Sequence, residues 1–165
     1  MNGKVLKVNA YGTWDSAINI TKGTIKNVTI ARGFRGIFIN HNNSTQGKVY
    51  LENVIVDGPT YTISCDQGTG NGLEANNCTF NGWTSFAETI GDVKFTNCKF
   101  GKGAGYSVCV PYAKTEFVGC DFSEGYQFYV ENEISLENCT INGVKITEEN
   151  VGSIIVEGIN NVTIK

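Results

Sequence analysis

The chain has 165 residues, a formal net charge of −3 and 18% charged residues. This length suits one domain with a buried core, so we expect a single domain over residues 1–165. The lysines and arginines form no basic run, which argues against a nucleic-acid partner. No apolar run approaches the length of a membrane span. Ile and Val far outnumber Leu, and this excess of β-branched residues favours strands over helices.

In chain order, we expect an irregular first coil over residues 1–23, and a sequence motif is repeated along the chain after it. Each copy carries an Asn, replaced once by Gly, before a small apolar residue. These steps are Asn27-Val28, Asn53-Val54, Asn77-Cys78, Asn97-Cys98, Gly119-Cys120, Asn138-Cys139 and Asn161-Val162, at intervals of 19 to 26 residues. Self-similarity at this period is typical of a solenoid, whose coils bury one another. We therefore expect an all-β solenoid of about seven coils.

Alternation of apolar and polar residues predicts three short strands in each coil. One strand leads into the Asn, at residues 49–51, 93–95, 115–117 and 134–136. The next follows it, at residues 54–56, 78–80, 98–100, 120–122, 139–141 and 162–164. The remaining strand comes after a Gly or a loop, at residues 36–39, 61–64, 85–86, 106–108, 126–130 and 144–146.

The repeated Asn predicts a sharp bend between two strands. It lies between two inward-facing apolar residues, so the chain must turn there without losing its alternation. One residue at positive φ achieves this, and Asn tolerates the left-handed region better than other side chains. Gly119 fits the same place because glycine reaches that region without steric cost. We expect left-handed dihedrals at these positions and a ladder of Asn side chains between coils.

With its Asn-Cys-x-Phe turns, as at Asn77–Phe80 and Asn97–Phe100, the chain resembles the right-handed parallel β-helix superfamily, the pectate-lyase-like fold. The resemblance covers nearly the whole length and implies a single-stranded right-handed parallel β-helix. Many members of that superfamily are non-catalytic adhesins, tail-spikes or surface repeats. Its polygalacturonase-like hydrolases carry Asn-Thr-Asp, Asp-Asp, Gly-His-Gly and Arg-Ile-Lys motifs, and none of the four occurs here. The resemblance therefore favours a non-enzymatic member.

Four of the six cysteines occupy one equivalent position in consecutive coils, namely Cys78, Cys98, Cys120 and Cys139. We expect them to form an inward column of free thiols, since Val28 and Val54 take the same slot. Neighbouring strands are about 4.7–4.9 Å apart, too far to gather four sulfurs around one tetrahedral ion or to join parallel neighbours by disulfides. Cys109, between two valines expected to face inward, is predicted to point outward.

Charged residues on the outer faces predict ladders of alternating sign. Glu74, Lys94 and Glu116 are equivalent in successive coils, and Lys99 and Asp121 are equivalent on the following strand. Such alternation avoids contact between like charges. We interpret both sets as residues of the solvent-exposed surface.

Aromatic residues near loops are the best candidates for binding a ligand, because exposed rings stack on the apolar faces of sugars. The predicted ligand-binding residues are Trp83, Tyr112, Tyr129 and Glu131. The alternative for Trp83 is that it covers the edge of a coil. A second candidate is a calcium site formed by Asp66, Glu88, Asp92 and Glu131, which follow strands and could share one face. We expect no other cofactor.

Two functional hypotheses follow from these features. The first is a secreted or cell-surface module that binds carbohydrate or acts as an adhesin-like spacer. The second is a lyase or hydrolase that acts on a polyuronate or another glycan. The last predicted strand has no polar cap after it, and an uncapped coil exposes edge hydrogen bonds. We therefore also expect self-association or flanking domains at the ends of the solenoid.

Overall fold

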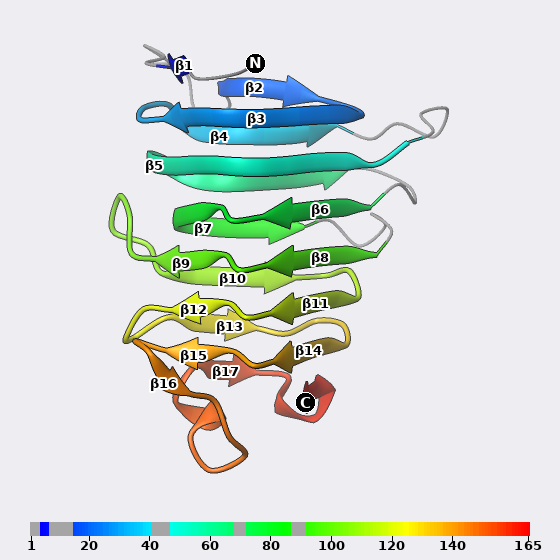
Figure 1. Cartoon of the computed structure of the whole chain (residues 1–165), viewed down its shortest axis with the longest axis vertical. Helices are drawn as coiled ribbons and strands as arrows, with labels where there is room; N and C mark the ends of the chain where they lie inside the picture. The colour runs from blue at the N-terminus through cyan, green and yellow to red at the C-terminus, as the bar shows by residue number, and fades with distance from the viewer. Residues whose placement is uncertain (1–3, 7–14, 41–46, 68–71, 87–91) are drawn as a thin grey trace.

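A computed structural model describes residues 4–6, 15–40, 47–67, 72–86 and 92–165. The chain forms an all-β parallel solenoid of about five turns, whose strands stack along the long axis of the molecule (Figure 1). Among the described residues the only helical segments are two short 3₁₀ helices, η1 (Val151–Ser153) and η2 (Ile159–Asn161). The predicted fold class is confirmed.

The strands that lead into the bends form one parallel ladder, which we name sheet A. Its register runs from Ile25 through Leu51 and Ala75 to Phe95, Phe117 and Leu136. Sheet A consists of the first part of β3 (Gly23–Ile30), the first part of β5 (Val49–Gln67), β6 (Leu73–Asn76), β8 (Val93–Thr96), β11 (Thr115–Val118), β14 (Ile134–Glu137) and β18 (Val162–Ile164).

Two further ladders complete each coil. Sheet B, after the bends, consists of β1 (Lys4–Leu6), the end of β3, the middle of β5, the start of β7 (Thr79–Phe86), β9 (Lys99–Gly101), β12 (Asp121–Phe122) and β15 (Thr140–Ile141). Sheet C consists of β2 (Ser16–Ile20), β4 (Arg35–Asn40), the ends of β5 and β7, β10 (Val108–Pro111), β13 (Gln127–Tyr129) and β17 (Ile155–Glu157). The predicted irregular coil at 1–23 contains β1, β2 and the first residue of β3, with residues 1–3 and 7–14 outside the described part.

The bends between sheets A and B have the predicted left-handed backbone at six of seven positions. Asn27, Asn53, Asn77, Asn97 and Asn138 have φ between 51° and 53°, and Gly119 has φ of 62°. Of the expected ladder of amides, the described residues show one rung, in which Asn53 Nδ2 donates to Asn27 Oδ1 at 3.1 Å. Each bend lets two successive strands face the same core without breaking their alternation.

The interior is filled by inward-facing side chains from all three sheets. Aliphatic residues such as Ile30, Ile39 and Val56 fill the first coils, and they are fully buried. Aromatic rings fill the later coils, where Phe100 lies 5.1–6.0 Å, between ring centroids, from five others. Those five are Phe80, Phe95, Phe117, Phe122 and Tyr126. Such edge and stacked geometries are the favoured ones for aromatic pairs.

The last coil corrects three expectations. Residues 144–146 are not a strand of sheet C, because β16 (Val144–Lys145) folds back antiparallel to β15. The strand at 162–164 pairs with β14 and so belongs to sheet A. Its Asn161 ends η2 and is not a left-handed bend. About seven coils were predicted, and the structure forms about five turns.

The core at the C-terminal end is covered, contrary to the prediction that it lacks a cap. Ile146, Val151 and Ile154, from the segment between β16 and β17, are buried members of the hydrophobic core. This cover is apolar and comes before the last strand, whereas the prediction rested on the lack of a polar cap after that strand.

Candidate functional site

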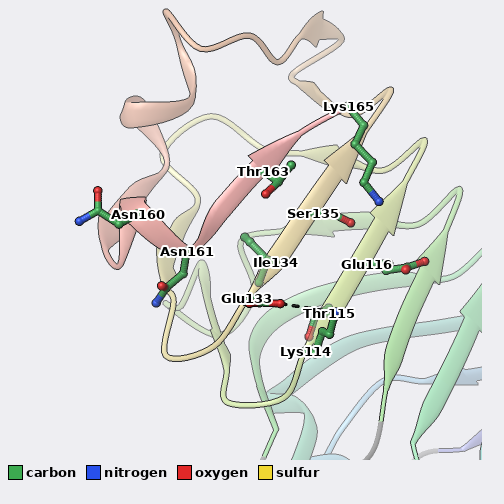
Figure 2. A pocket seen from close by; sticks show the side chains of 10 residues that line it. All are labelled: Lys114, Thr115, Glu116, Glu133, Ile134, Ser135, Asn160, Asn161, Thr163 and Lys165. Atoms are coloured by element: carbon green, nitrogen blue, oxygen red, sulfur yellow. Dashed lines mark ion pairs between the residues drawn. The ribbon is translucent and has the colours of Figure 1, made fainter.

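The outer face of sheet A is hollowed near the C-terminal coils (Figure 2). The cavity has a volume of about 380 Å³. Three parallel strands, β11, β14 and β18, form its floor and present Glu116, Ser135 and Thr163 in one register. Its lining is Lys114, Thr115, Glu116, Glu133, Ile134, Ser135, Asn160, Asn161, Thr163 and Lys165. We name this hollow, with the neighbouring cavity described below, the sheet A groove.

Several polar groups in the groove are not engaged by the protein. The side chains of Ser135, Asn160, Asn161 and Thr163 make no hydrogen bond to the described residues. The Lys165 amine also has no ion-pair partner there. Hydroxyl, amide and amine groups can each donate hydrogen bonds, and the first two can also accept them. The groove therefore offers uncommitted hydrogen-bonding groups at a regular spacing.

A second cavity of about 300 Å³ continues the groove toward earlier coils. It shares Lys114 and Glu116 with the first and is also lined by Lys48, Glu74, Asp92, Val93 and Lys94. The two cavities together extend over the outer faces of β6, β8, β11, β14 and β18. An elongated ligand would fit this surface better than a compact one.

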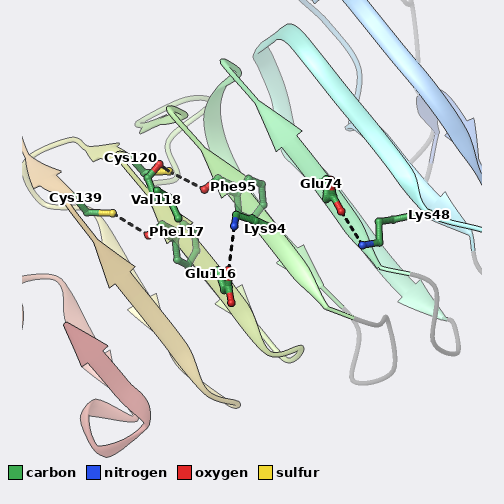
Figure 3. A network of polar contacts seen from close by, with 9 residues as sticks. All are labelled: Lys48, Glu74, Lys94, Phe95, Glu116, Phe117, Val118, Cys120 and Cys139. Atoms are coloured by element: carbon green, nitrogen blue, oxygen red, sulfur yellow. Dashed lines mark hydrogen bonds and ion pairs between the residues drawn. The ribbon is translucent and has the colours of Figure 1, made fainter. Parts of the chain in front are cut away.

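The carboxylates of the groove are largely neutralised by lysines from neighbouring coils (Figure 3). Lys48 Nζ lies 2.7 Å from Glu74 Oε1, and its hydrogen bond to Glu74 raises the pKa of Lys48. Glu116 pairs with Lys94 at 3.3 Å. Lys114 pairs with Glu133 at 3.4 Å (Figure 2). All of these groups are partly exposed, so each pair contributes little to stability.

The predicted charge ladders have the expected register. Glu74 aligns with Lys94, and Lys94 aligns with Glu116. Lys99 aligns with Asp121 on sheet B. There the carboxylate of Asp121 accepts hydrogen bonds from Thr140 Oγ1 and, at 2.9 Å, from the Gly143 N–H. Asp121 therefore holds the turn between β15 and β16.

Trp83, the first predicted ligand-binding residue, lies in a row of rings on the outside of the solenoid. Its ring stacks on Tyr61 at 5.1 Å between centroids and contacts Tyr106 at 5.4 Å. Tyr61 in turn contacts Phe34 at 5.4 Å. This packing corresponds to the alternative interpretation, in which Trp83 covers the edges of neighbouring coils.

The other predicted ligand-binding residues lie at, or just beyond, the opposite ends of the sheet C strands. Tyr112 follows β10 and is partly buried, and its carbonyl accepts a hydrogen bond from Asn132 Nδ2 at 3.0 Å. Tyr129 ends β13, and Glu131 is exposed just after it. Trp83 aligns with Val108, at the start of β10. The strand length therefore separates Trp83 from Tyr112, and the structure does not gather the four residues into one site.

The predicted calcium set is only partly within the described residues. Asp66 is in β5, but its side chain lies outside the described part, as does Glu88. Asp92 is exposed and lines the second cavity of the groove, and Glu131 is exposed elsewhere. Within the described ranges there is no group of three or more His, Cys, Asp or Glu residues that could surround a metal ion.

The column of cysteines is as predicted, with every thiol free and buried. Each thiol lies within hydrogen-bonding distance of backbone carbonyls, as in Cys139 Sγ, which lies 3.4 Å from the Phe117 oxygen (Figure 3). The neighbouring Cys98 thiol and burial raise the pKa of Cys78. The neighbouring thiols of Cys139 and Cys98, together with burial, raise the pKa of Cys120.

Cys109 does not point outward. It is fully buried, and burial raises the pKa of its thiol. Its strand aligns it with Thr84 and Phe128, which are both fully buried. The inward column of sheet C therefore passes through Cys109.

Sequence reasoning missed the groove residues Ser135, Thr163, Asn160 and Lys165. Ser135 is the outward residue of a correctly predicted strand, so alignment of the coils could have placed it beside Glu116. Thr163 could not be placed, because its strand was assigned to sheet B.

The fold and groove define the chain as a parallel β-solenoid with a polar surface groove. Comparison with protein-family models gives no match, and neither does comparison with curated proteins or with solved structures. In the described part of the chain, no helix has the length and apolar character needed to cross a membrane.

Proposed function

We propose that the protein is a non-catalytic β-helix module that binds a glycan in the sheet A groove. The observation that carries the proposal is the set of uncommitted hydroxyl, amide and amine groups around Ser135 and Thr163. A glycan presents many hydroxyls, which such groups recognise by donating and accepting hydrogen bonds. We place this module outside the cell or on its surface, where glycan ligands are abundant.

The pairing of charges supports a binding role over the alternative of a glycan-cleaving enzyme. Acid–base catalysis on a glycosidic bond requires two carboxyl groups with separate roles. In the groove, Glu74, Glu116 and Glu133 are each paired with a lysine. Asp92 is the one carboxylate of the described groove with no lysine within ion-pair distance, and it interacts with Lys48 only at longer range.

The groove is tested by removing hydroxyls while preserving shape. We expect the double variant Ser135→Ala, Thr163→Val to bind a selected oligosaccharide about tenfold more weakly, since each lost hydrogen bond costs about 0.5–1.5 kcal/mol. Ligands are first selected on a glycan array, and affinity is then measured by isothermal titration calorimetry. Thr29→Val, on the outer face of sheet B, is the matched control and should retain wild-type affinity.

Two results would contradict this proposal. Equal loss of affinity in the Thr29→Val control would place the ligand elsewhere. Release of new reducing ends or unsaturated uronate products from the bound glycan would instead support the enzyme hypothesis, and Asp92→Asn would then be the first variant to assay.

A further inference from the structure

The four-thiol column, Cys78, Cys98, Cys120 and Cys139, has a geometry that its packing role does not require. The strand register places each of these residues directly beside the next, on four consecutive coils. All four thiols are free, and each is at most 2% exposed. The column is thus a straight row of sulfurs spaced by the strand separation of about 4.7–4.9 Å.

That separation excludes a tetrahedral site but matches another coordination geometry. A metal–thiolate bond to zinc is about 2.3 Å, so two such bonds placed end to end span about 4.6 Å. This is close to the distance between neighbouring strands. A linear, two-coordinate ion between two adjacent thiols therefore requires almost no movement of the backbone. Soft ions prefer thiolate ligands, and among them mercury(II) binds two thiolates in a linear arrangement.

We propose that adjacent thiols of the column bind soft, two-coordinate metal ions, one ion between each pair of coils. Four thiols in a row form two separate pairs, Cys78 with Cys98 and Cys120 with Cys139. The chain therefore binds two ions when every thiol is used once. The site needs only two ligands for each ion, so it is consistent with the lack of larger ligand groups among the described residues.

The binding reaction is a simple exchange of protons for metal. Each thiol loses its S–H proton to solvent and forms one sulfur–metal bond, because a coordinating thiol is deprotonated outright. Mercury(II) bound by two thiolates leaves the pair neutral, with two protons released for each ion. A neutral product suits a buried site, where an unpaired charge is costly.

Access to the column is short because each cysteine directly follows an exposed bend. Asn77, Asn97, Gly119 and Asn138 are all exposed, and each is the immediate neighbour of one thiol. The bend at Gly119 has no side chain to cover Cys120. An ion therefore reaches the sulfurs through the bends, without crossing the aromatic core.

Valine is the natural substitute for testing the column. Val28 and Val54 occupy the same slot in earlier coils and are buried there, so Cys→Val substitutions preserve the packing. In the variant Cys98→Val, Cys139→Val, the remaining Cys78 and Cys120 are two strand spacings apart, about 9.5 Å, and cannot share an ion. The control Cys65→Val, Cys109→Val also removes two buried thiols but leaves the column intact.

The experiment is a titration of the folded protein with mercury(II) chloride in the presence of a monothiol competitor. Native mass spectrometry counts bound ions, and the ultraviolet charge-transfer band of the mercury dithiolate reports their coordination. We expect two ions in the wild type and in the control, one in Cys98→Val, and none retained in Cys98→Val, Cys139→Val. We also expect binding to raise the melting temperature of the wild type, since the ions bind the native state.

Three results would overturn the proposal: equal retention by both double variants, no binding by the folded wild type, or binding only after unfolding. Circular dichroism of each variant checks that its fold is retained. If the double variant does not fold, the single variant Cys98→Val tests the proposal. Binding between adjacent thiols predicts that this variant holds one ion, whereas binding in proportion to the number of thiols predicts little change from the wild type. These outcomes do not depend on whether the groove binds a glycan.

Discussion

At the scale of the residue, the bends show how one dihedral angle determines a fold. The left-handed conformation is unfavourable for most L-residues by about 1–2 kcal/mol, and the chain places Asn or Gly at each bend between sheets A and B. The side chain that tolerates the bend also points outward, where it can bond to the next coil. Gly119 keeps the conformation but has no amide that could form such a bond.

Substitution of Gly119 separates these two effects. We expect Gly119→Ala to lower the free energy of unfolding by about 1–2 kcal/mol, because alanine is strained at φ of 62°. Gly119→Asn should cost less, since Asn tolerates this region and its amide could bond to the neighbouring Asn97. Its Cβ would lie 2.6 Å from Asn97 Oδ1, which is the end of a flexible side chain that can turn away.

Urea denaturation followed by circular dichroism measures both variants of Gly119. Gly152→Ala is the control, because nothing lies near an added Cβ there and its φ is not positive. Equal losses for Gly119→Ala and Gly119→Asn would show that space, and not backbone strain, limits this position.

The bends could be predicted from sequence because their cause is local, whereas the orientation of Cys109 could not. Alternation places Val108 and Val110 on one side and Cys109 on the other, and both sides contain apolar residues. Only the register with Thr84 and Phe128 decides which side faces the core. That register depends on contacts between coils, which a single strand does not encode.

At the scale of the element, most strands could be predicted from the sequence, but the hairpin between β15 and β16 could not. Asn142-Gly143 resembles the other Asn and Gly positions of the repeat, but both residues have positive φ, at 49° and 77°. Two such residues form the tight turn of an antiparallel hairpin, for which Asn-Gly is a strong signal. The hairpin displaced the next strand of sheet C to β17 and moved β18 to sheet A.

The aromatic stack gives a prediction at this scale. Phe100, in β9, is about 1% exposed and contacts rings from its own coil and from both neighbours. We expect Phe100→Ala to lower the free energy of unfolding by about 3–5 kcal/mol, through lost burial and the cavity left behind. Phe100→Leu, which keeps most of the volume, should cost about 1–2 kcal/mol.

Thermal and urea unfolding measure the effect of both Phe100 variants. The exposed Tyr50→Ala serves as a surface control, since its side chain is 43% exposed on the outer face of sheet A. A loss in Phe100→Ala no larger than in this control would mean that the stack does not support the coils on either side.

At the scale of the whole molecule, each coil is a nearly exchangeable unit. Residues 98–119 run from one bend to the next and contain one strand of each sheet, β9, β10 and β11. We expect their deletion to leave a folded protein that is shorter by about 4.7–4.9 Å, because Asn97 would then precede Cys120 with the repeat intact. Its stability should fall, since one interface between coils is lost.

Small-angle scattering and circular dichroism measure the length and fold of this deletion. The control is deletion of 98–108, which removes half a coil and should prevent cooperative folding. If the complete-coil deletion is also unfolded, neighbouring coils are specific to each other and not exchangeable.

The groove is a property of the whole molecule, and this explains why the sequence did not reveal it. Its residues come from sequence positions as distant as Lys48 and Lys165, which are united only by the stacking of coils. The sequence identified Glu74, Lys94 and Glu116 as one outward row, which is part of the groove. The rest depended on the last coil, where the repeat is broken.

The direction of the hydrogen bonds determines how this protein would respond to mechanical load. Backbone bonds between coils run along the long axis, so tension applied to the two ends loads successive coils in series (Figure 1). Parallel ladders pulled in this direction open one rung at a time, because the bonds do not share the force. The molecule should therefore lengthen coil by coil at low force, and each opened coil would release the full extended length of its residues.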